Sequence, residues 1–218
     1  SLASPILTSR TLADGILYVN ISLFDGGVAR DLRYLLQQQD HASLRGVIVD
    51  VRNNPGGYLD VAVEAAGLFI AEGVIVSQQG RSGVYTWAYE DKGKLLVISG
   101  PGGRQSSAVR QEPLDPSIPV VVLVNQGTAS AAEVLAAALQ DHGRAILIGE
   151  PTFGKSAVTG DYTLSDGSSI HMTNGQWASP KGRSVNGHGL APDIPVAADA
   201  ADGDAIVEVA AQWLLAKR

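Results

Sequence analysis

Two short runs of almost purely apolar residues constrain the fold of this chain more than any other feature. Residues 46–51 read GVIVDV and residues 119–124 read PVVVLV. Strands without alternation between apolar and polar positions are typical of a parallel sheet that is buried on both faces. The two runs therefore predict central strands of a sheet on which helices pack.

Strands and helices alternate along much of the remaining chain. Gly15–Ile21 is an alternating, β-branched run, and the apolar residues of Val28–Gln39 recur at helical spacing. Further expected elements are strands at 74–77, 84–89 and 144–149, and helices at 59–71, 130–140 and 205–217. This order predicts an α/β layered fold with a mainly parallel central sheet.

Two segments depart from this alternation. Residues 156–177 alternate around the turn-forming residues 165–168, which predicts a hairpin and a β-rich C-terminal part. Residues 90–119 are polar and contain a glycine- and proline-rich cluster at 100–103. We therefore expect a flexible insertion or lid at 90–119.

Composition limits the class of protein and the chemistry available to it. The 218 residues carry a net charge of −6, with 45% hydrophobic and 17% charged residues, which is typical of one soluble globular domain. The absence of basic clusters argues against nucleic acid as a partner. The absence of cysteine excludes disulfides, thiolate zinc sites and a cysteine nucleophile, and we expect neither metal nor cofactor. No apolar run has the ~18 residues of a membrane span, and no signal peptide opens the chain.

One motif points to nucleotides but lacks its usual context. Residues 149–156 (GEPTFGKS) fit the phosphate-loop pattern, which cradles phosphates at the N-terminus of a following helix. Residues 157–163 contain β-branched residues and a glycine, so they predict a strand instead. No apolar strand that ends in aspartate follows to hold magnesium. Nucleotide binding is therefore disfavoured.

Ser130 lies just after a buried strand, at the start of an expected helix. Residues 130–133 (SAAE) fit a capping box, which is a purely structural role for Ser130 and Glu133. The functional alternative is a serine nucleophile, for which the N–H of the next residue and the helix dipole stabilise an oxyanion.

A serine nucleophile needs a base, and the histidines do not offer one at a recognisable spacing. His41, His142, His171 and His188 have no acid in a characteristic position nearby, and no G-x-S-x-G motif is present. Lysine can act as the base if burial lowers its pKa. Lys155 begins a strand at the same edge of the sheet, so we select it; the alternative for any lysine is a solvated surface charge.

Four blocks of residues together resemble the catalytic core of the carboxyl-terminal processing (tail-specific) peptidases, which are serine-lysine endopeptidases. The blocks are residues 46–57, 127–133, 149–155 and 189–194, with 179–184 similar to the family's loop before the last block. The resemblance runs from about Gly15 to Val196. It implies a ClpP/crotonase-like layered fold in which residues 1–218 form one catalytic domain. The residues before the first strand are too few for the PDZ domain that often precedes this core.

The resemblance also implies roles for single residues. Ser130 matches the nucleophile and Lys155 the general base, while the backbone N–H groups of Gly56 and Ala131 match the oxyanion hole. Many members carry a glutamine four residues after the lysine, where this chain has Thr159.

Two further residues are candidates for orienting the site. Thr159 shares a strand face with Lys155 and can hydrogen-bond it, although with a shorter reach than glutamine. Glu133 matches an acidic position of the family and either orients the site or only caps the helix.

The function implied is a serine endopeptidase that cleaves polypeptide substrates near their carboxyl termini through an acyl-enzyme. The alternative is a non-proteolytic relative of the same fold that binds an apolar ligand or a protein partner. The family implies a periplasmic or other extracytoplasmic location. The oligomeric state and the natural substrate do not follow from the sequence.

Overall fold

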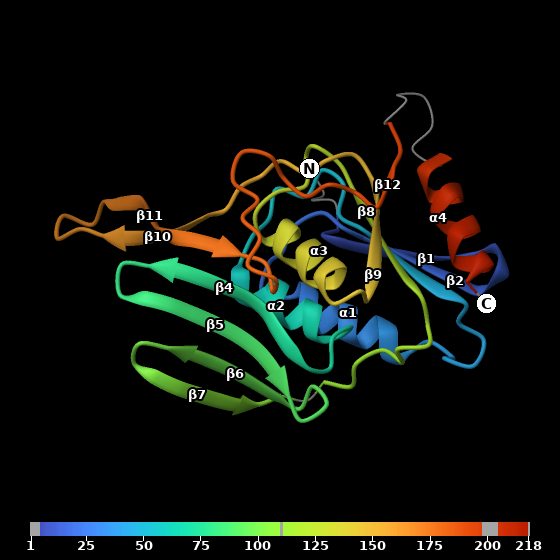
Figure 1. The fold of residues 1–218 in the computed structure, drawn as a ribbon, viewed down its shortest axis with the longest axis horizontal. Helices are drawn as coiled ribbons and strands as arrows, with labels where there is room; N and C mark the ends of the chain where they lie inside the picture. Colours follow the sequence, from blue (N-terminus) through green and yellow to red (C-terminus); the bar gives the residue numbers. More distant parts are fainter. Residues whose placement is uncertain (1–4, 110, 198–204, 218) are drawn as a thin grey trace.

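The computed structural model describes residues 5–109, 111–197 and 205–217, and its first sheet contains the strands that the apolar runs predict. The order of this sheet is β1-β2-β3-β8-β9-β12 (Figure 1). β3 and β8 pair in parallel near its centre, and every residue of both strands is buried. The strands are β1 (Leu7–Leu12), β2 (Ile16–Ile21), β3 (Gly46–Asp50), β8 (Val120–Val124), β9 (Ala145–Gly149) and β12 (Ile194–Pro195).

Helices cover both faces of the first sheet. Val47 and Val49 of β3 belong to a core shared with α1, α2 and α3, whereas the intervening Ile48 packs with α4 on the other face. The helices are α1 (Val28–Gln37), α2 (Leu59–Gly67), α3 (Ala131–Asp141) and α4 (Ala205–Ala216), and a short 3₁₀ turn, η1 (Ala13–Gly15), joins β1 to β2. Within the described residues, no helix is long and apolar enough to cross a membrane.

The expectation of a mainly parallel central sheet holds for the first sheet, but a second sheet is entirely antiparallel. Its order is β10-β11-β4-β5-β6-β7, and all of its pairings are antiparallel. The first sheet is parallel except between β1 and β2. The second sheet is made of β4 (Gly73–Gly80), β5 (Gly83–Glu90), β6 (Leu95–Gly100), β7 (Gly103–Ala108), β10 (Ala157–Thr163) and β11 (Ser169–Ala178).

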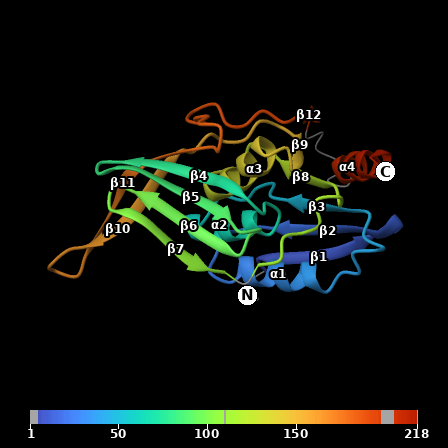
Figure 2. The same cartoon turned by 60° about the horizontal axis from the view of Figure 1, so that its bottom comes forward.

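The physical reason for the difference lies in the turns. The Gly80–Gly83 and Gly100–Gly103 pairs leave only two residues between consecutive strands, and such a connection permits antiparallel pairing only. Strand-rich sequence is therefore not confined to the C-terminal part of the chain. Figure 2 shows the second sheet extending away from the first, with the β10–β11 hairpin reaching furthest.

The segment 90–119 contains regular structure. β6 and β7 fall within it and form a hairpin at the edge of the second sheet. Every residue of β7 is exposed. The role of this segment as a flexible lid stays a prediction.

Candidate active site

Ser130 lies in the turn between β8 and α3, in a backbone conformation that few residues other than glycine adopt. Its φ is 55° and its ψ is −120°. A residue held in such a sparsely populated region costs about 1–3 kcal/mol, and strain of this kind is concentrated at functional sites. The predicted capping box with Glu133 is present. The N–H of Ala131, the first residue of α3, donates to no acceptor in the described part of the chain.

The glycine turn before α2 lies directly against Ser130. A Cβ atom on Gly56 would stand 2.7 Å from Ser130 Cβ and 3.1 Å from Ala131 N, so only glycine leaves space there. The Gly56 N–H is already engaged, because it donates to Asn54 Oδ1 at 2.8 Å. The Gly57 N–H has no acceptor among the described residues, and Gly57 lines the same pocket as Ser130.

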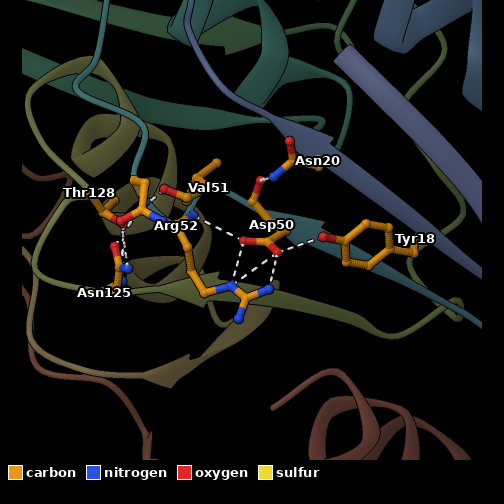
Figure 3. A network of polar contacts seen from close by, with 8 residues as sticks. Tyr18, Asn20, Asp50, Val51, Arg52, Asn125 and Thr128 are labelled. Atoms are coloured by element: carbon orange, nitrogen blue, oxygen red, sulfur yellow. Dashed lines mark hydrogen bonds and ion pairs between the residues drawn. The ribbon is translucent and has the colours of Figure 1, made fainter. Parts of the chain in front are cut away.

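Side-chain hydrogen bonds hold this glycine turn against the β8–α3 turn (Figure 3). The Asn53 N–H donates to Asn125 Oδ1 at 2.9 Å, and Asn125 Nδ2 donates back to Asn53 Oδ1 at 3.0 Å. Thr128 Oγ1 donates to the Val51 carbonyl at 2.8 Å. The two loops are thus connected at the carboxyl edge of β3 and β8, where parallel sheets commonly bind ligands.

An ion pair between a buried carboxylate and a partly exposed arginine anchors the start of the glycine turn. Asp50, at the end of β3, is 1% exposed and is held by the guanidinium and the backbone N–H of Arg52. Tyr18 donates its hydroxyl to Asp50 Oδ2 at 2.7 Å (Figure 3). Burial, together with this bond to a carboxylate, raises the pKa of Tyr18 to about 12.

The carboxylate of Glu133 connects the nucleophile turn to the loop that carries Lys155. Glu133 is fully buried. Its Oε2 accepts the N–H of Ser130 at 2.9 Å and the N–H of Lys155 at 2.8 Å. Its Oε1 accepts the Gly154 N–H at 2.8 Å and the Thr152 hydroxyl. One side chain therefore sets the distance between the backbones of Ser130 and Lys155.

The side chain of Lys155 itself is exposed. Neither its Nζ nor Ser130 Oγ is joined to the other by a hydrogen bond, although both residues are described. The Lys155 carbonyl accepts the indole N–H of Trp177 at 2.9 Å, so its backbone is held from two sides. Thr159 lines the pocket beside Ser130. The structure thus brings Ser130, Glu133, Lys155 and Thr159 to one site. The roles of Lys155 and Thr159 stay predictions.

A pocket with a mixed polar and apolar lining opens beside Ser130. Its volume is about 130 Å³, and its lining includes Leu59, Val134 and Val158 together with Ser130 and Thr159. A cavity of ~150 Å³ accommodates a molecule the size of benzene. This pocket therefore has room for one small or medium side chain next to the candidate nucleophile.

The phosphate-loop motif has a different role in the fold. β10, a strand, follows it directly where nucleotide binding would require a helix. The loop N–H groups of Gly154 and Lys155, which would face a phosphate, donate to Glu133 instead. This arrangement speaks against the nucleotide-binding interpretation.

None of the four histidines is hydrogen-bonded to Ser130. His41 contacts the Leu36 carbonyl, His142 the Val74 carbonyl, His171 the Asp161 carboxylate and His188 the Asn186 carbonyl. The described residues contain no group of three or more histidine, aspartate or glutamate side chains placed to hold a metal ion.

Sequence reasoning missed residues that build the site from a distance. Thr152 and Trp177 contact the elements of the site, and Asn125 and Thr128 connect its two loops. Asparagine and threonine directly after a buried strand are an available signal, because their side chains satisfy loop backbone groups. Trp177 gave no such signal, since an aromatic residue on a strand is ordinarily part of a core.

Comparison with known proteins identifies relatives of this chain. The model of Peptidase family S41 matches residues 15–196. A carboxyl-terminal-processing protease of Synechocystis sp. is 35% identical over 176 residues, which are 81% of this chain and 36% of the relative. The chloroplastic carboxyl-terminal-processing peptidase 3 of Arabidopsis thaliana is 34% identical over 196 residues, with 88% and 34% covered. The chain spans about a third of the length of these curated relatives.

Solved structures agree with this comparison. A photosystem II D1 C-terminal processing protease matches with a TM-score of 0.69 at 27% identity, covering 89% of this chain and 49% of that one. A lipoprotein from Streptococcus agalactiae matches with the same TM-score at 18% identity, over 99% of this chain and 71% of that chain, which is a likeness of fold alone.

Proposed function

This chain belongs to Peptidase family S41, and from that premise we propose that it is a serine endopeptidase with Ser130 as nucleophile and Lys155 as general base. The observation that carries the proposal is the convergence at Ser130. A strained serine at a helix N-terminus faces a glycine turn and a small pocket, and one buried carboxylate holds it to the lysine loop.

The proposed reaction begins with proton transfer from Ser130 Oγ to the neutral amine of Lys155. Ser130 Oγ then attacks the scissile carbonyl carbon and forms a tetrahedral intermediate. The protonated Lys155 gives its proton to the departing amine, which leaves an acyl-enzyme. A water molecule, deprotonated by Lys155, then attacks the ester carbonyl carbon. The protonated Lys155 returns this proton to Ser130 Oγ as it departs, which releases the carboxylic acid product and restores the free hydroxyl and the neutral amine. Because Lys155 is exposed at rest, this sequence requires its side chain to turn towards Ser130 when substrate is bound.

The oxyanion formed in each half of this reaction needs donors that are free to bind it. The Ala131 N–H is one, at the N-terminus of α3. The glycine turn supplies the second. The Gly57 N–H is available in the present conformation, whereas the Gly56 N–H becomes available only when Asn54 Oδ1 releases it.

The pocket beside Ser130 suggests which residue precedes the cleaved bond. Its volume fits a small or medium side chain, and Leu59, Val134 and Val158 form the apolar part of its lining, so we propose that a residue of this size precedes the scissile bond. Cleavage near the carboxyl terminus of the substrate is proposed from the names of the relatives. A location outside the cytoplasm is proposed from membership of the family.

The test uses purified wild type, Ser130→Ala, Lys155→Ala and Lys155→Arg, assayed on an unfolded protein and on a tail peptide. We expect cleavage by the wild type and loss of at least 10³-fold in kcat/KM in each variant. The arginine variant is the matched control for charge, because it keeps the cation but cannot accept a proton. Undiminished cleavage by Ser130→Ala and Lys155→Ala would disprove the dyad.

A non-proteolytic protein that binds an apolar ligand or partner is the second candidate. The exposed side chain of Lys155, without a hydrogen bond to Ser130, favours it. A fluorophosphonate probe distinguishes the two candidates, because only an activated serine reacts with it. Covalent labelling of Ser130 that is lost in Lys155→Ala supports the peptidase. Labelling no faster than in a denatured control, together with saturable binding of an apolar ligand, supports the second candidate.

A further inference from the structure

The hairpin formed by β10 and β11 carries an exposed apolar face that the proposed chemistry does not use. Nine large hydrophobic residues are exposed in the described part of the chain, and four of them lie on this hairpin. They are Tyr162 (47% exposed), Leu164 (42%), Ile170 (42%) and Met172 (47%). Exposed apolar groups gathered in this way commonly mark an interaction surface.

The register of the hairpin places these side chains on one face. Tyr162 pairs with Ile170, and Gly160 with Met172, so the side chains of these pairs point to the same side. Leu164 follows Tyr162 by two residues and continues the row. Asp161 and His171, which pair with each other through a 2.7 Å contact, lie on the opposite face. We call the row of Tyr162, Leu164, Ile170 and Met172 the hairpin face.

The backbone of β10 is also open along one side. β10 is the edge strand of the second sheet. Trp177 N–H donates to the Ser156 carbonyl and Leu164 N–H to the Ser168 carbonyl, so the even-numbered residues of this strand point their backbone groups at β11. Backbone groups alternate along a strand, so those of residues 157, 159, 161 and 163 point outward. No described residue accepts or donates a hydrogen bond there.

This open edge begins inside the candidate active site. Ala157, Val158 and Thr159 are the first residues of β10, and all three line the pocket beside Ser130. The seven residues of β10 span roughly 23 Å at about 3.3 Å per residue. A chain that lies along β10 is therefore led from the hairpin face to the nucleophile. Figures 1 and 2 both show the hairpin projecting beyond the rest of the fold.

We propose that an extended segment of the substrate polypeptide adds to β10 as a further strand and packs every second side chain on the hairpin face. The occupant is an unfolded, apolar stretch of the chain that is being cleaved. Continuity of the edge with the Ser130 pocket selects this occupant over a second copy of the protein. Strand addition supplies backbone hydrogen bonds without regard to sequence, and the hairpin face selects apolar residues at alternate positions. The inference rests on the proposed peptidase function and extends it to how the substrate is held.

The experiment compares two labelled peptides, one of about 14 residues that spans the pocket and β10 and one of about 6 residues that reaches the pocket only. Their affinities are measured by fluorescence anisotropy in a Ser130→Ala background, and their kcat/KM values with Ser130 intact. The test variant is Tyr162→Ser/Ile170→Ser/Met172→Ser. The control is Tyr34→Ser/Val84→Ser, which removes exposed apolar side chains elsewhere.

The hairpin variant is expected to weaken binding of the long peptide at least tenfold and to leave cleavage of the short peptide within twofold of the wild type. The control variant is expected to change neither. Equal affinity of the hairpin variant and the wild type for the long peptide, or an equal loss for both peptides, overturns the inference. A change from dimer to monomer in light scattering, with the affinity for the long peptide unchanged, assigns the hairpin face to a second copy and also overturns it.

A second pair of variants isolates the backbone of the edge. Asp161→Pro removes an outward N–H and places a ring where the added strand would lie, whereas Asp161→Ala keeps the N–H. We expect at least tenfold weaker binding of the long peptide for proline and little change for alanine. Equal binding by both variants contradicts strand addition. Melting temperatures close to that of the wild type establish that the variants are folded.

The two proposals fail in different ways. If the wild type cleaves neither peptide while the Ser130→Ala protein binds the long peptide through the hairpin face, the peptidase proposal fails and the docking surface stands. If Ser130-dependent cleavage of the long peptide is insensitive to the hairpin variant, the docking surface fails and the peptidase stands.

Discussion

Glu133→Gln tests whether one buried carboxylate holds the nucleophile and the base in register. The carboxylate is fully buried and accepts four hydrogen bonds. Oε2 receives the N–H groups of Ser130 and Lys155, and Oε1 receives the Gly154 N–H and the Thr152 hydroxyl. Glutamine keeps the size of the side chain but replaces one acceptor oxygen by an NH₂ group.

The structure sets the expected cost. The least costly orientation points the amide oxygen at Ser130 and Lys155 and the NH₂ group at Gly154, whose buried N–H is then left without an acceptor. An orphaned buried donor costs about 1–3 kcal/mol. The bonds from the Ser130 and Lys155 N–H groups lose their charge-assisted character, at about 1 kcal/mol each, while the Thr152 hydroxyl oxygen can accept from the new NH₂ group. We therefore expect the free energy of unfolding to fall by about 3–5 kcal/mol, which a typical domain with 5–15 kcal/mol survives.

The measurements are urea unfolding, kcat/KM and the rate of fluorophosphonate labelling of Ser130. We expect a decrease of at least tenfold in labelling of the folded protein, because the backbone that positions Ser130 and Lys155 is released. Asp141→Asn is the matched control. Asp141 is a carboxylate that is 9% exposed, accepts the Lys181 N–H at 2.9 Å and pairs with Arg183, without contact to the site.

Two results would refute the reasoning. If Glu133→Gln loses stability but labels and cleaves as fast as Asp141→Asn, then Glu133 only caps α3. If its free energy of unfolding falls by less than 1 kcal/mol, the hydrogen bonds do not have the strength assigned to them.

Three further predictions concern the glycine turn, the strained serine and the buried tyrosines. Gly56→Ala places a Cβ against Ser130 and is expected to lower kcat/KM by about 10²–10³-fold. Gly102→Ala, with open space around its Cβ, is the control and is expected to leave kcat/KM unchanged. Equal kcat/KM values for the two variants would show that a Cβ at position 56 does not disturb the site. Ser130→Gly is expected to unfold with a free energy about 1 kcal/mol higher than Ser130→Ala, since both lose the hydroxyl and only glycine relieves the positive φ; chemical denaturation measures the difference, and equal stability excludes strain. Burial raises the pKa of Tyr18 and of Tyr89 to about 12. The stability that these two groups contribute is therefore complete below pH 10 and decreases as pH rises towards 12. An absorbance titration at 295 nm is expected to show two of the six tyrosines ionising near pH 12, and to lose that step in Tyr18→Phe/Tyr89→Phe.

The sequence predicted the first sheet because its central strands are almost continuously apolar, which is the pattern of strands buried on both faces. β8 is apolar throughout and β3 is apolar up to Asp50 at its end, so their neighbours in the fold follow from few assumptions. β1 and β7 were missed for the opposite reason. Most of β1 and every residue of β7 are exposed, so their sequences carry no alternation of apolar and polar residues. Edge strands of this kind are defined by the partner beside them.

The site was predictable where it depends on topology alone. Parallel strands bring the turns after β3 and β8 to one edge, so the proximity of Gly56 and Ser130 follows from the strand order. Side-chain geometry, which the sequence does not contain, determines the hydrogen bond from the Gly56 N–H to Asn54 Oδ1. It also determines the exposure of Lys155. The link from Glu133 to Lys155 joins residues 22 positions apart and needed the tertiary structure.

The capping and nucleophile interpretations of Ser130 describe compatible properties of one hydroxyl. A capping oxygen accepts a hydrogen bond through one lone pair, and a nucleophile uses its second lone pair for attack and donates its proton to a base. The cap therefore holds Oγ at the N-terminus of α3, where the helix dipole stabilises negative charge. In the same box, Glu133 accepts the N–H groups of both Ser130 and Lys155. Local helix capping and the spacing of the proposed dyad consequently depend on the same side chain, so selection for one also preserves the other.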